Sequence, residues 1–223
     1  MKKLFVGFLI STVTASAGTI ISYTTLASWS STVTGATLTD FEGVYGAGTG
    51  AFQPGGQVTV GLINIQTVNA SGRLYWSGPG VYAVSSILTT QPRQPVQFDR
   101  FVVTPSAAKT AIAFDLGNFR FNEHVDIQFH FVDSTSQTLN VLTPALNAST
   151  NLRFFGFTGD TAIDQVTIAR TAVISDAFSY GLGIDNIRLG DATATPEPAS
   201  ALLAASALVA LGSLRRWRQT RSC

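Results

Sequence analysis

Two carboxylates near the start of the chain have the spacing of a cation ligand pair. Asp40 and Glu42 flank Phe41 and precede Gly43. Successive side chains point to opposite faces of a strand, so both carboxylates would lie on one face. Calcium and other hard cations take oxygen ligands of this kind. The pair is therefore a candidate for binding calcium, and the alternative is a solvated strand face.

Both histidines belong to one alternating segment, residues 124–131, in which polar and apolar side chains take turns. This alternation predicts a strand with one buried and one polar face. His124 and His130 lie on the polar face with Asp126 and Gln128. At about 3.4 Å per residue they are roughly 20 Å apart, too far to bind one metal ion. The polar row is interpreted as solvent-facing or groove-lining, with a ligand-binding sheet as the alternative.

Three aromatic residues, Tyr75, Trp76 and Tyr82, flank the turn-forming segment 78–80. On an exposed loop such rings could stack on sugar rings, and in a Phe-rich β-domain they could instead cover the core or an edge.

The chain has no Gly-x-Ser-x-Gly elbow, no His-Glu-x-x-His and no Gly-x-x-x-x-Gly-Lys phosphate loop. A glycosidase needs two carboxylates about 5–9.5 Å apart in space.

The composition excludes several classes of protein. Of 223 residues, 45% are hydrophobic and only 12% are charged, against about 25% charged in ordinary soluble domains. Residues 18–195 hold eight basic and twelve acidic residues, a net charge of −4. This negative net charge argues against a nucleic-acid-binding domain, because such a domain needs clustered basic residues. The one cysteine, Cys223, excludes an intrachain disulfide.

Strand alternation dominates the middle of the chain, and a helical period is hard to find there. Short alternating segments separated by Gly, Pro, Asn, Ser and Asp clusters predict an antiparallel all-β domain, a sandwich or jelly roll. The predicted strands are 58–65, 98–103, 111–116, 125–131, 152–157, 162–168 and 184–189. The Ser/Thr-rich residues 18–30 are interpreted as a leader or a first edge strand.

The N-terminal residues 1–17 have the three parts of a secretory signal helix. Lys2 and Lys3 form the charged region, residues 4–10 are apolar, and Ala15 and Ala17 supply the small residues of a cleavage site. We expect the Sec machinery to export the chain and signal peptidase to cut after Ala17. A second possible site follows residues 25–27.

The C-terminal end combines Pro196-Glu197-Pro198, sixteen small or apolar residues (199–214) and an Arg-rich end. As a helix the apolar run rises about 24 Å, and about 28 Å if extended to Trp217, close to the roughly 30 Å of a hydrocarbon core. The arginines should stay cytoplasmic, which places the body outside. They are Arg215, Arg216, Arg218 and Arg221. The sequence therefore predicts a C-terminal transmembrane helix.

This C-terminal arrangement closely resembles the PEP-CTERM sorting signal of Gram-negative bacteria. The resemblance rests on Pro196, Glu197 and Pro198, the helix 199–214, and the arginines that follow, Arg215, Arg216 and Arg218. It implies recognition by exosortase, a membrane protease, and cleavage near the motif. The chain would pass through the inner membrane and reach the cell surface or the extracellular matrix. A plain tail anchor that is never cleaved is the alternative.

Segments 111–116, 125–131 with Asp133, 154–157, 163–168 and 181–187 resemble those of a β-sandwich domain common among PEP-CTERM proteins, and they cover roughly residues 98–190. It also looks similar to jelly-roll carbohydrate-binding modules. In many of these a Phe-Glu near the first strand and an Asp on the last strand help to hold a structural calcium ion. The resemblance thus adds Asp185 to Asp40 and Glu42 as a calcium ligand, and the alternative is that Asp185 caps a turn.

The predicted organisation is a signal peptide (1–17), a jelly-roll-like β-sandwich (18–190), a linker with the Pro-Glu-Pro motif (191–198) and a transmembrane helix with its Arg-rich tail (199–223). The expected function is a non-catalytic structural or glycan-binding role at the cell surface or in the biofilm matrix. The alternative is a secreted hydrolase that acts on polysaccharide. Extracellular polysaccharide is the expected partner and nucleic acid is not.

Overall fold

The described part of the chain is almost entirely antiparallel β-structure. The computed structural model describes residues 18–41, 52–53, 56–67, 73–77, 87–91, 100–118, 122–144, 152–171 and 182–193. The chain divides into two compact units, Met1–Ala192 and Thr193–Cys223. Within the described ranges no helix has the length and hydropathy needed to span a bilayer. The predicted signal segment and the predicted C-terminal helix lie outside these ranges. The expectation of an antiparallel all-β domain is confirmed.

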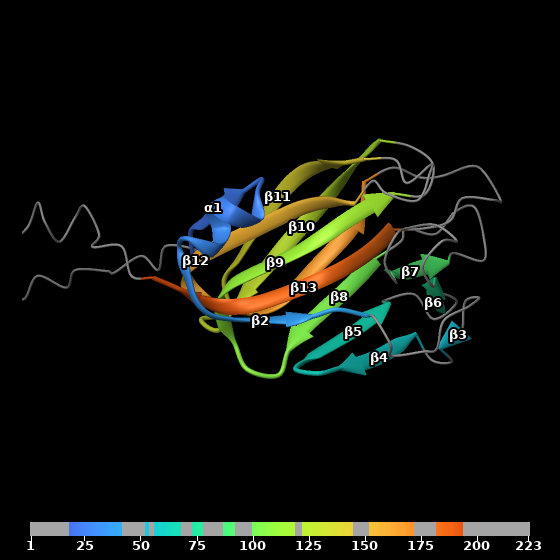
Figure 1. Ribbon diagram of the computed structural model, residues 1–223, viewed down its shortest axis with the longest axis horizontal. Coiled ribbons are helices and arrows are strands. Elements are labelled where there is room, and N and C mark those ends of the chain that lie inside the picture. The colour runs from blue at the N-terminus through green and yellow to red at the C-terminus, as the bar shows by residue number, and fades with distance from the viewer. Residues whose placement is uncertain are drawn as a thin grey trace, which may run out of the picture. The chain divides into compact units, whose positions relative to one another are not determined.

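Thirteen strands and one short helix make up the described elements (Figure 1). In chain order they are β1 (Ile20–Tyr23), α1 (Leu26–Ser30), β2 (Val33–Thr39), β3 (Phe52–Gln53), β4 (Gln57–Val60), β5 (Ile63–Thr67), β6 (Arg73–Ser77), β7 (Ile87–Gln91), β8 (Arg100–Pro105), β9 (Lys109–Asn118), β10 (Glu123–Phe131), β11 (Ser136–Thr143), β12 (Arg153–Arg170) and β13 (Leu182–Ala192).

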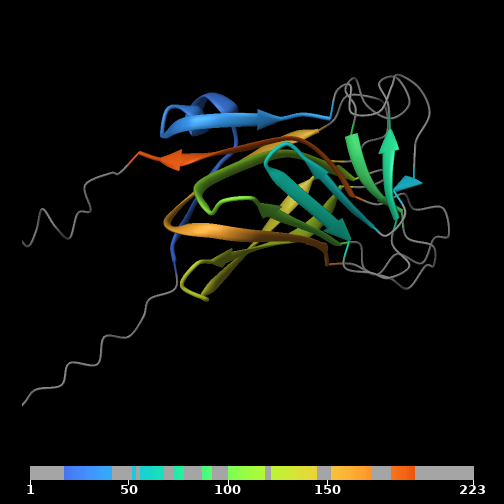
Figure 2. The ribbon, with the colours of Figure 1, turned by 90° about the horizontal axis from the view of Figure 1, so that it is seen from below.

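The strand β12 joins two layers of the domain. Its first half pairs with β9 and β1, and its second half pairs with β10 and β8. One layer therefore runs β3-β6-β7-β13-β9-β12-β1, with β2 also paired to β13, and the other runs β11-β10-β12-β8-β5-β4. Figure 2 shows β2 and β13 along one side of the domain and β10 and β11 along the other.

The core lies between these layers and contains the alternating apolar residues of both. On β10 the odd-numbered side chains from Val125 to Phe131 are buried, as the sequence pattern predicts, and the even-numbered ones are partly or fully exposed. Aromatic contacts cross the core, since Phe157 of β12 lies against Phe114 of β9 and Phe129 of β10, with ring centroids 5.7 and 4.8 Å apart. Burial of this apolar surface is the main term that stabilises the fold.

A second, smaller cluster forms where α1 packs on the outer side of β9 and β12. The helix starts at Thr25, whose hydroxyl accepts a hydrogen bond from the Ser28 N–H at 3.2 Å. Trp29 is its one buried residue and packs against Ala111 and Ala113. The small alanine side chains, and Gly156 on the neighbouring strand, leave room for the indole. A Cβ on Gly156 would lie only 2.7 Å from Trp29.

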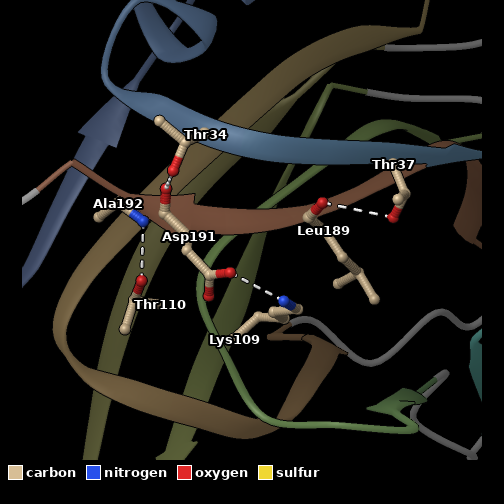
Figure 3. A network of polar contacts seen from close by, with 7 residues as sticks. All are labelled: Thr34, Thr37, Lys109, Thr110, Leu189, Asp191 and Ala192. Atoms are coloured by element: carbon tan, nitrogen blue, oxygen red, sulfur yellow. Dashed lines mark hydrogen bonds and ion pairs between the residues drawn. The ribbon is translucent and has the colours of Figure 1, made fainter.

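The end of β13 is fixed by polar contacts to β2 and β9, shown in Figure 3. Lys109 Nζ lies 2.8 Å from Asp191 Oδ2, and the Ala192 N–H donates to Thr110 Oγ1 at 2.7 Å. Thr34 donates to the Asp191 carbonyl at 3.3 Å. The ordered strand thus continues to Ala192, two residues beyond the boundary expected from the sequence.

Two strand predictions differ from the structure. Residues 58–65 form a hairpin, β4 and β5, because Gly61 takes a φ of +54° and turns the chain there. The predicted strands 152–157 and 162–168 are one continuous strand, β12. Tertiary contacts keep its middle extended, since the Asp160 N–H donates to the Thr19 carbonyl and the Val132 N–H to the Ala162 carbonyl.

Candidate functional site

The outer side of the layer β11-β10-β12-β8-β5-β4 is a broad polar surface, which we call the polar face. Directly paired residues of antiparallel strands share a face, so the register defines its members. The polar members are Ser136, Thr138 and Asn140 of β11, His124, Asp126, Gln128 and His130 of β10, Gln165 and Thr167 of β12, Arg100 and Thr104 of β8, Asn64 and Gln66 of β5, and Gln57 and Thr59 of β4.

Side-chain amides are the commonest groups on the polar face. They are the six residues Gln57, Asn64, Gln66, Gln128, Asn140 and Gln165. An amide group both donates and accepts hydrogen bonds, as a sugar hydroxyl does, and five hydroxyl-bearing residues lie among the amides. The ionisable members are two histidines, Asp126 and Arg100, so the polar face carries little net charge. Its chemistry suits a neutral, hydroxyl-rich ligand.

Three side chains of the polar face form a hydrogen-bonded chain across β10 and β11. Asn140 Nδ2 donates to Asp126 Oδ1 at 2.7 Å, and Asn140 Oδ1 lies 2.6 Å from His124 Nδ1. An amide oxygen only accepts, so Nδ1 of His124 must carry the proton in this contact. These contacts hold the side chains in place, which lowers the entropy lost when a ligand binds.

The second site lies on the opposite layer, at an irregularity in β13. Asp185 pairs directly with Asp115 of β9, and the register then shifts before Arg188. Asn186 is the extra residue and takes a φ of +50°, a left-handed conformation that Asn tolerates better than most residues. Asp185 is 1% exposed and accepts hydrogen bonds from the Asn186 N–H at 2.7 Å and from its Nδ2 at 3.1 Å.

The pKa of Asp115 is raised above its ordinary value of 3.8 by burial of the carboxyl group. The positive charge of Arg188, whose Nη1 lies 3.8 Å away, and a hydrogen bond from Asn186 act in the opposite direction without cancelling it. The guanidinium group also lies over the Phe154 ring, 5.7 Å from its centroid. The charged form of Asp115 is therefore less stable in the folded chain than in the unfolded one.

Replacing Asp115 with Asn is expected to stabilise the protein more at neutral pH than at acid pH. The raised pKa means that the folded state binds this proton more tightly, so the stabilising contribution is greatest at acid pH. It is lost as the pH rises from about 3.8 through the folded-state pKa. Urea unfolding of both proteins at about pH 3 and about pH 7 measures the difference.

The exposed Asp164 supplies the control for this change, as Asp164→Asn. An identical effect of Asp115→Asn at the two pH values would contradict the expectation.

The three residues predicted to bind calcium are only partly described. Asp40 is exposed and follows β2, Asp185 is buried on β13, and Glu42 lies outside the described residues. The pairing of β2 with β13 places Thr39 opposite Ile187, so the segments carrying Asp40 and Asp185 are neighbours. Among the described residues no group of three or more His, Cys, Asp or Glu side chains is placed to hold a metal ion.

Most other predicted site residues lie outside the described ranges. Tyr75 and Trp76 are in β6, where Tyr75 pairs with Phe52 of β3 and Trp76 with Leu88 of β7. Tyr82, the cleavage-site residues Ala15 and Ala17, and the sorting residues Pro196, Glu197, Pro198, Arg215, Arg216 and Arg218 are not described. These predictions therefore stay predictions.

Sequence reasoning missed two parts of these sites. Asp115 is not among the predicted site residues. It lies between Phe114 and Leu116, which are buried in the core, so its side chain must point to the opposite face of the strand. The strand β11 was also missed, although residues 136–142 alternate between polar and apolar side chains in part. Without β11 the sequence showed a single polar row, whereas the structure shows a face six strands wide.

Comparisons with known proteins reveal only distant similarity. No protein-family model matches the chain, and no curated protein matches it. A variant of the family 29 carbohydrate-binding module CBM29-2 is 12% identical, covering 73% of this chain and 98% of its own, with a TM-score of 0.40. CBM29_1 from Piromyces equi is 11% identical, covering 70% and 91%, with a TM-score of 0.38.

An exo-beta-agarase is 11% identical and has a TM-score of 0.40, but the match covers 72% of this chain and only 26% of the agarase. These values describe a shared strand arrangement at most. They assign this chain neither a ligand nor an activity.

Proposed function

We propose that this chain is an exported, non-catalytic protein of the cell surface or extracellular matrix, whose jelly-roll-like β-sandwich binds neutral polysaccharide. The observation that carries the binding role is the polar face, with its amides and hydroxyls in register over six strands. Such a face offers many donors and acceptors and few charges, which matches an uncharged sugar chain better than a phosphate or an acidic polymer.

The export and sorting part of the proposal rests on the sequence. The signal peptide would direct Sec-dependent export with a cut by signal peptidase after Ala17. The segment Pro196-Glu197-Pro198, the apolar helix and Arg215, Arg216 and Arg218 would then serve as a PEP-CTERM signal. The helix would hold the chain in the inner membrane until an exosortase cuts near the motif and releases the domain.

Calcium is part of the proposal as a structural ion held by Asp40, Glu42 and Asp185. Support comes from the neighbouring positions of β2 and β13 and from the burial of Asp185. The ion would join the segment that follows β2 to the last strand, β13. Asp115, which lies opposite Asp185, would gain a counter-charge from the same ion.

The expected result is that the processed protein, released from a host that contains exosortase, lacks residues 199–223 and binds neutral polysaccharides on a glycan array. Replacing Gln128 and Gln165 together by Ala should weaken binding roughly tenfold, because each lost hydrogen bond contributes about 0.5–1.5 kcal/mol. The paired control, Ser22→Ala with Thr34→Ala, alters exposed residues of the other layer and should leave binding unchanged.

The array is run with calcium and with a chelator, and the melting temperature is measured in both. A structural ion raises the melting temperature, because it binds the folded state alone.

Failure to bind any glycan in either condition would contradict the binding role. Release of reducing sugar from a bound polysaccharide would favour the hydrolase alternative. An intact C-terminal peptide in the released protein would contradict the sorting role.

A further inference from the structure

We propose that signal peptidase cuts between Ala17 and Gly18 and that the α-ammonium group so created at Gly18 docks into a polar clamp. The clamp consists of Thr135, Gln137 and Asp160. This inference rests on the proposed export of the chain, and it goes beyond it by assigning the new terminus a role in the fold. Removal of the leader would then complete the domain as well as release it.

Three successive backbone N–H groups donate to side chains of the clamp. The Gly18 N–H donates to Thr135 Oγ1 at 3.4 Å, and the Ile20 N–H donates to Gln137 Oε1 at 2.8 Å. Between them, the Thr19 N–H donates to Asp160 Oδ1 at 2.8 Å. The three acceptors come from residues more than a hundred positions away: Asp160 lies on β12, Gln137 on β11, and Thr135 immediately before β11. Residues 18–20 are therefore held as an integral part of the fold.

The position of Gly18 is also sterically restricted. The residue is buried, and a Cβ built on it would lie 3.0 Å from the Phe131 ring. A contact this short requires the neighbouring side chain to move by a few tenths of an ångström. Glycine therefore fits at this place as it stands, whereas a residue with a side chain would require the Phe131 ring to shift.

The charge around Gly18 favours an ammonium group over an amide. Thr135, whose hydroxyl receives the Gly18 N–H, itself donates to Asp133 Oδ1 at 2.6 Å. Asp160 accepts a hydrogen bond from the next N–H, that of Thr19. Two carboxylates are thus each one hydrogen-bonded neighbour away from the nitrogen on which cleavage places a positive charge, and opposite charges attract. Before cleavage the same nitrogen is an uncharged amide.

The structure also discriminates between the two cleavage sites found in the sequence. A cut after Ala27 would remove β1, which pairs with β12 from Ile20 to Tyr23. It would also remove Thr25, the N-cap of α1. The folded domain would lose an edge strand and the start of the helix that carries Trp29. The cut after Ala17 leaves all of these contacts in place.

The test uses the purified full-length chain in detergent, treated with purified bacterial signal peptidase. The N-terminus is sequenced, and the melting temperature is measured before and after the cut. We expect Gly18 as the first residue and a rise of about 3 °C on cleavage, since a stabilisation near 1 kcal/mol shifts a domain of this size by about 2–4 °C. Asp160→Asn keeps the acceptor oxygen but removes one of the two charges, and should reduce the rise. The exposed Asp164→Asn of the same strand is the matched control and should retain it.

A product that begins at Ser28, a chain that resists cleavage, or a rise of undiminished size in Asp160→Asn would overturn the inference. Because the cut is made on purified protein, a failure of export in cells would count against the proposed function alone. Export with Gly18 as the first residue but no rise in melting temperature on cleavage would count against this inference alone.

Discussion

Replacing Arg170 with Met is expected to lower the free energy of unfolding by about 3–5 kcal/mol. Arg170 and Glu123 form a bidentate ion pair, in which Nε donates to Oε2 at 2.8 Å and Nη2 donates to Oε1 at 2.7 Å. The two side chains are 2% and 13% exposed. Without the guanidinium group the carboxylate keeps most of its desolvation cost and loses its paired charge. This makes the substitution far more costly than the loss of a surface ion pair.

Urea unfolding of the wild-type protein and the variant at neutral pH measures this effect. Arg153→Met is the matched control, because Arg153 lies on the same strand but is exposed, and it should change the stability by less than about 0.5 kcal/mol. Combining Arg170→Met with Glu123→Leu should recover part of the loss, since no charge is then left buried. Equal effects of Arg170→Met and Arg153→Met would show that the pair contributes no more than a surface contact.

Replacing Trp29 with Ala is expected to cost about 3–5 kcal/mol of stability, the usual range for removing a large buried aromatic side chain. The indole is 1% exposed and packs on Ala111 and Ala113. Its Nε1 donates to the Phe157 carbonyl at 3.1 Å, and its ring meets Phe154 edge-on at 6.4 Å. The cavity cannot be filled by collapse, because the facing side chains are already the smallest apolar ones.

Thermal and urea unfolding of Trp29→Ala are compared with those of Leu26→Ala on the same helix. Leu26 is 43% exposed, so its truncation should cost much less. Trp29→Phe keeps a ring in the cavity and loses the indole hydrogen bond, so its stability should fall between those of the wild-type protein and Trp29→Ala. A stability of Trp29→Ala equal to that of Leu26→Ala would mean that α1 does not contribute to the folded domain.

The strands that the sequence predicted well are those with strict alternation. In β10 every second residue is apolar over a full strand, and the structure buries those residues. Local pattern suffices here because one face of each strand meets the core and the other does not.

The edge strands could not be predicted in the same way. In β2 most side chains are exposed on both faces, so no alternation marks it, and it is ordered by pairing with β13.

The sequence of the long central strand β12 predicts two short strands, because Gly159 and Asp160 interrupt its apolar pattern. Its middle stays extended because residues 18–23 pair alongside it.

The candidate sites show the same division. Alternation around His124 and Asp126 predicted a polar row, but the contribution of Asn140 depends on a strand that pairs across a turn. The Arg170–Glu123 pair joins residues 47 positions apart and follows from register alone. No local pattern in the sequence indicates which residue pairs with Arg170. An ion pair between distant segments forms only when the register of the strands brings the two side chains together.

The sequence by itself determined the antiparallel β-class, the low charge of the body and the buried face of its central strands, because these depend on composition and on a period of two residues. It also carries the export and sorting predictions, which are local motifs. The tertiary structure decided which strands are neighbours, how wide the polar face is, and where Gly18 and Trp29 fit. These features depend on long-range register, and a shift of one residue in any strand pair would turn each side chain to the opposite face.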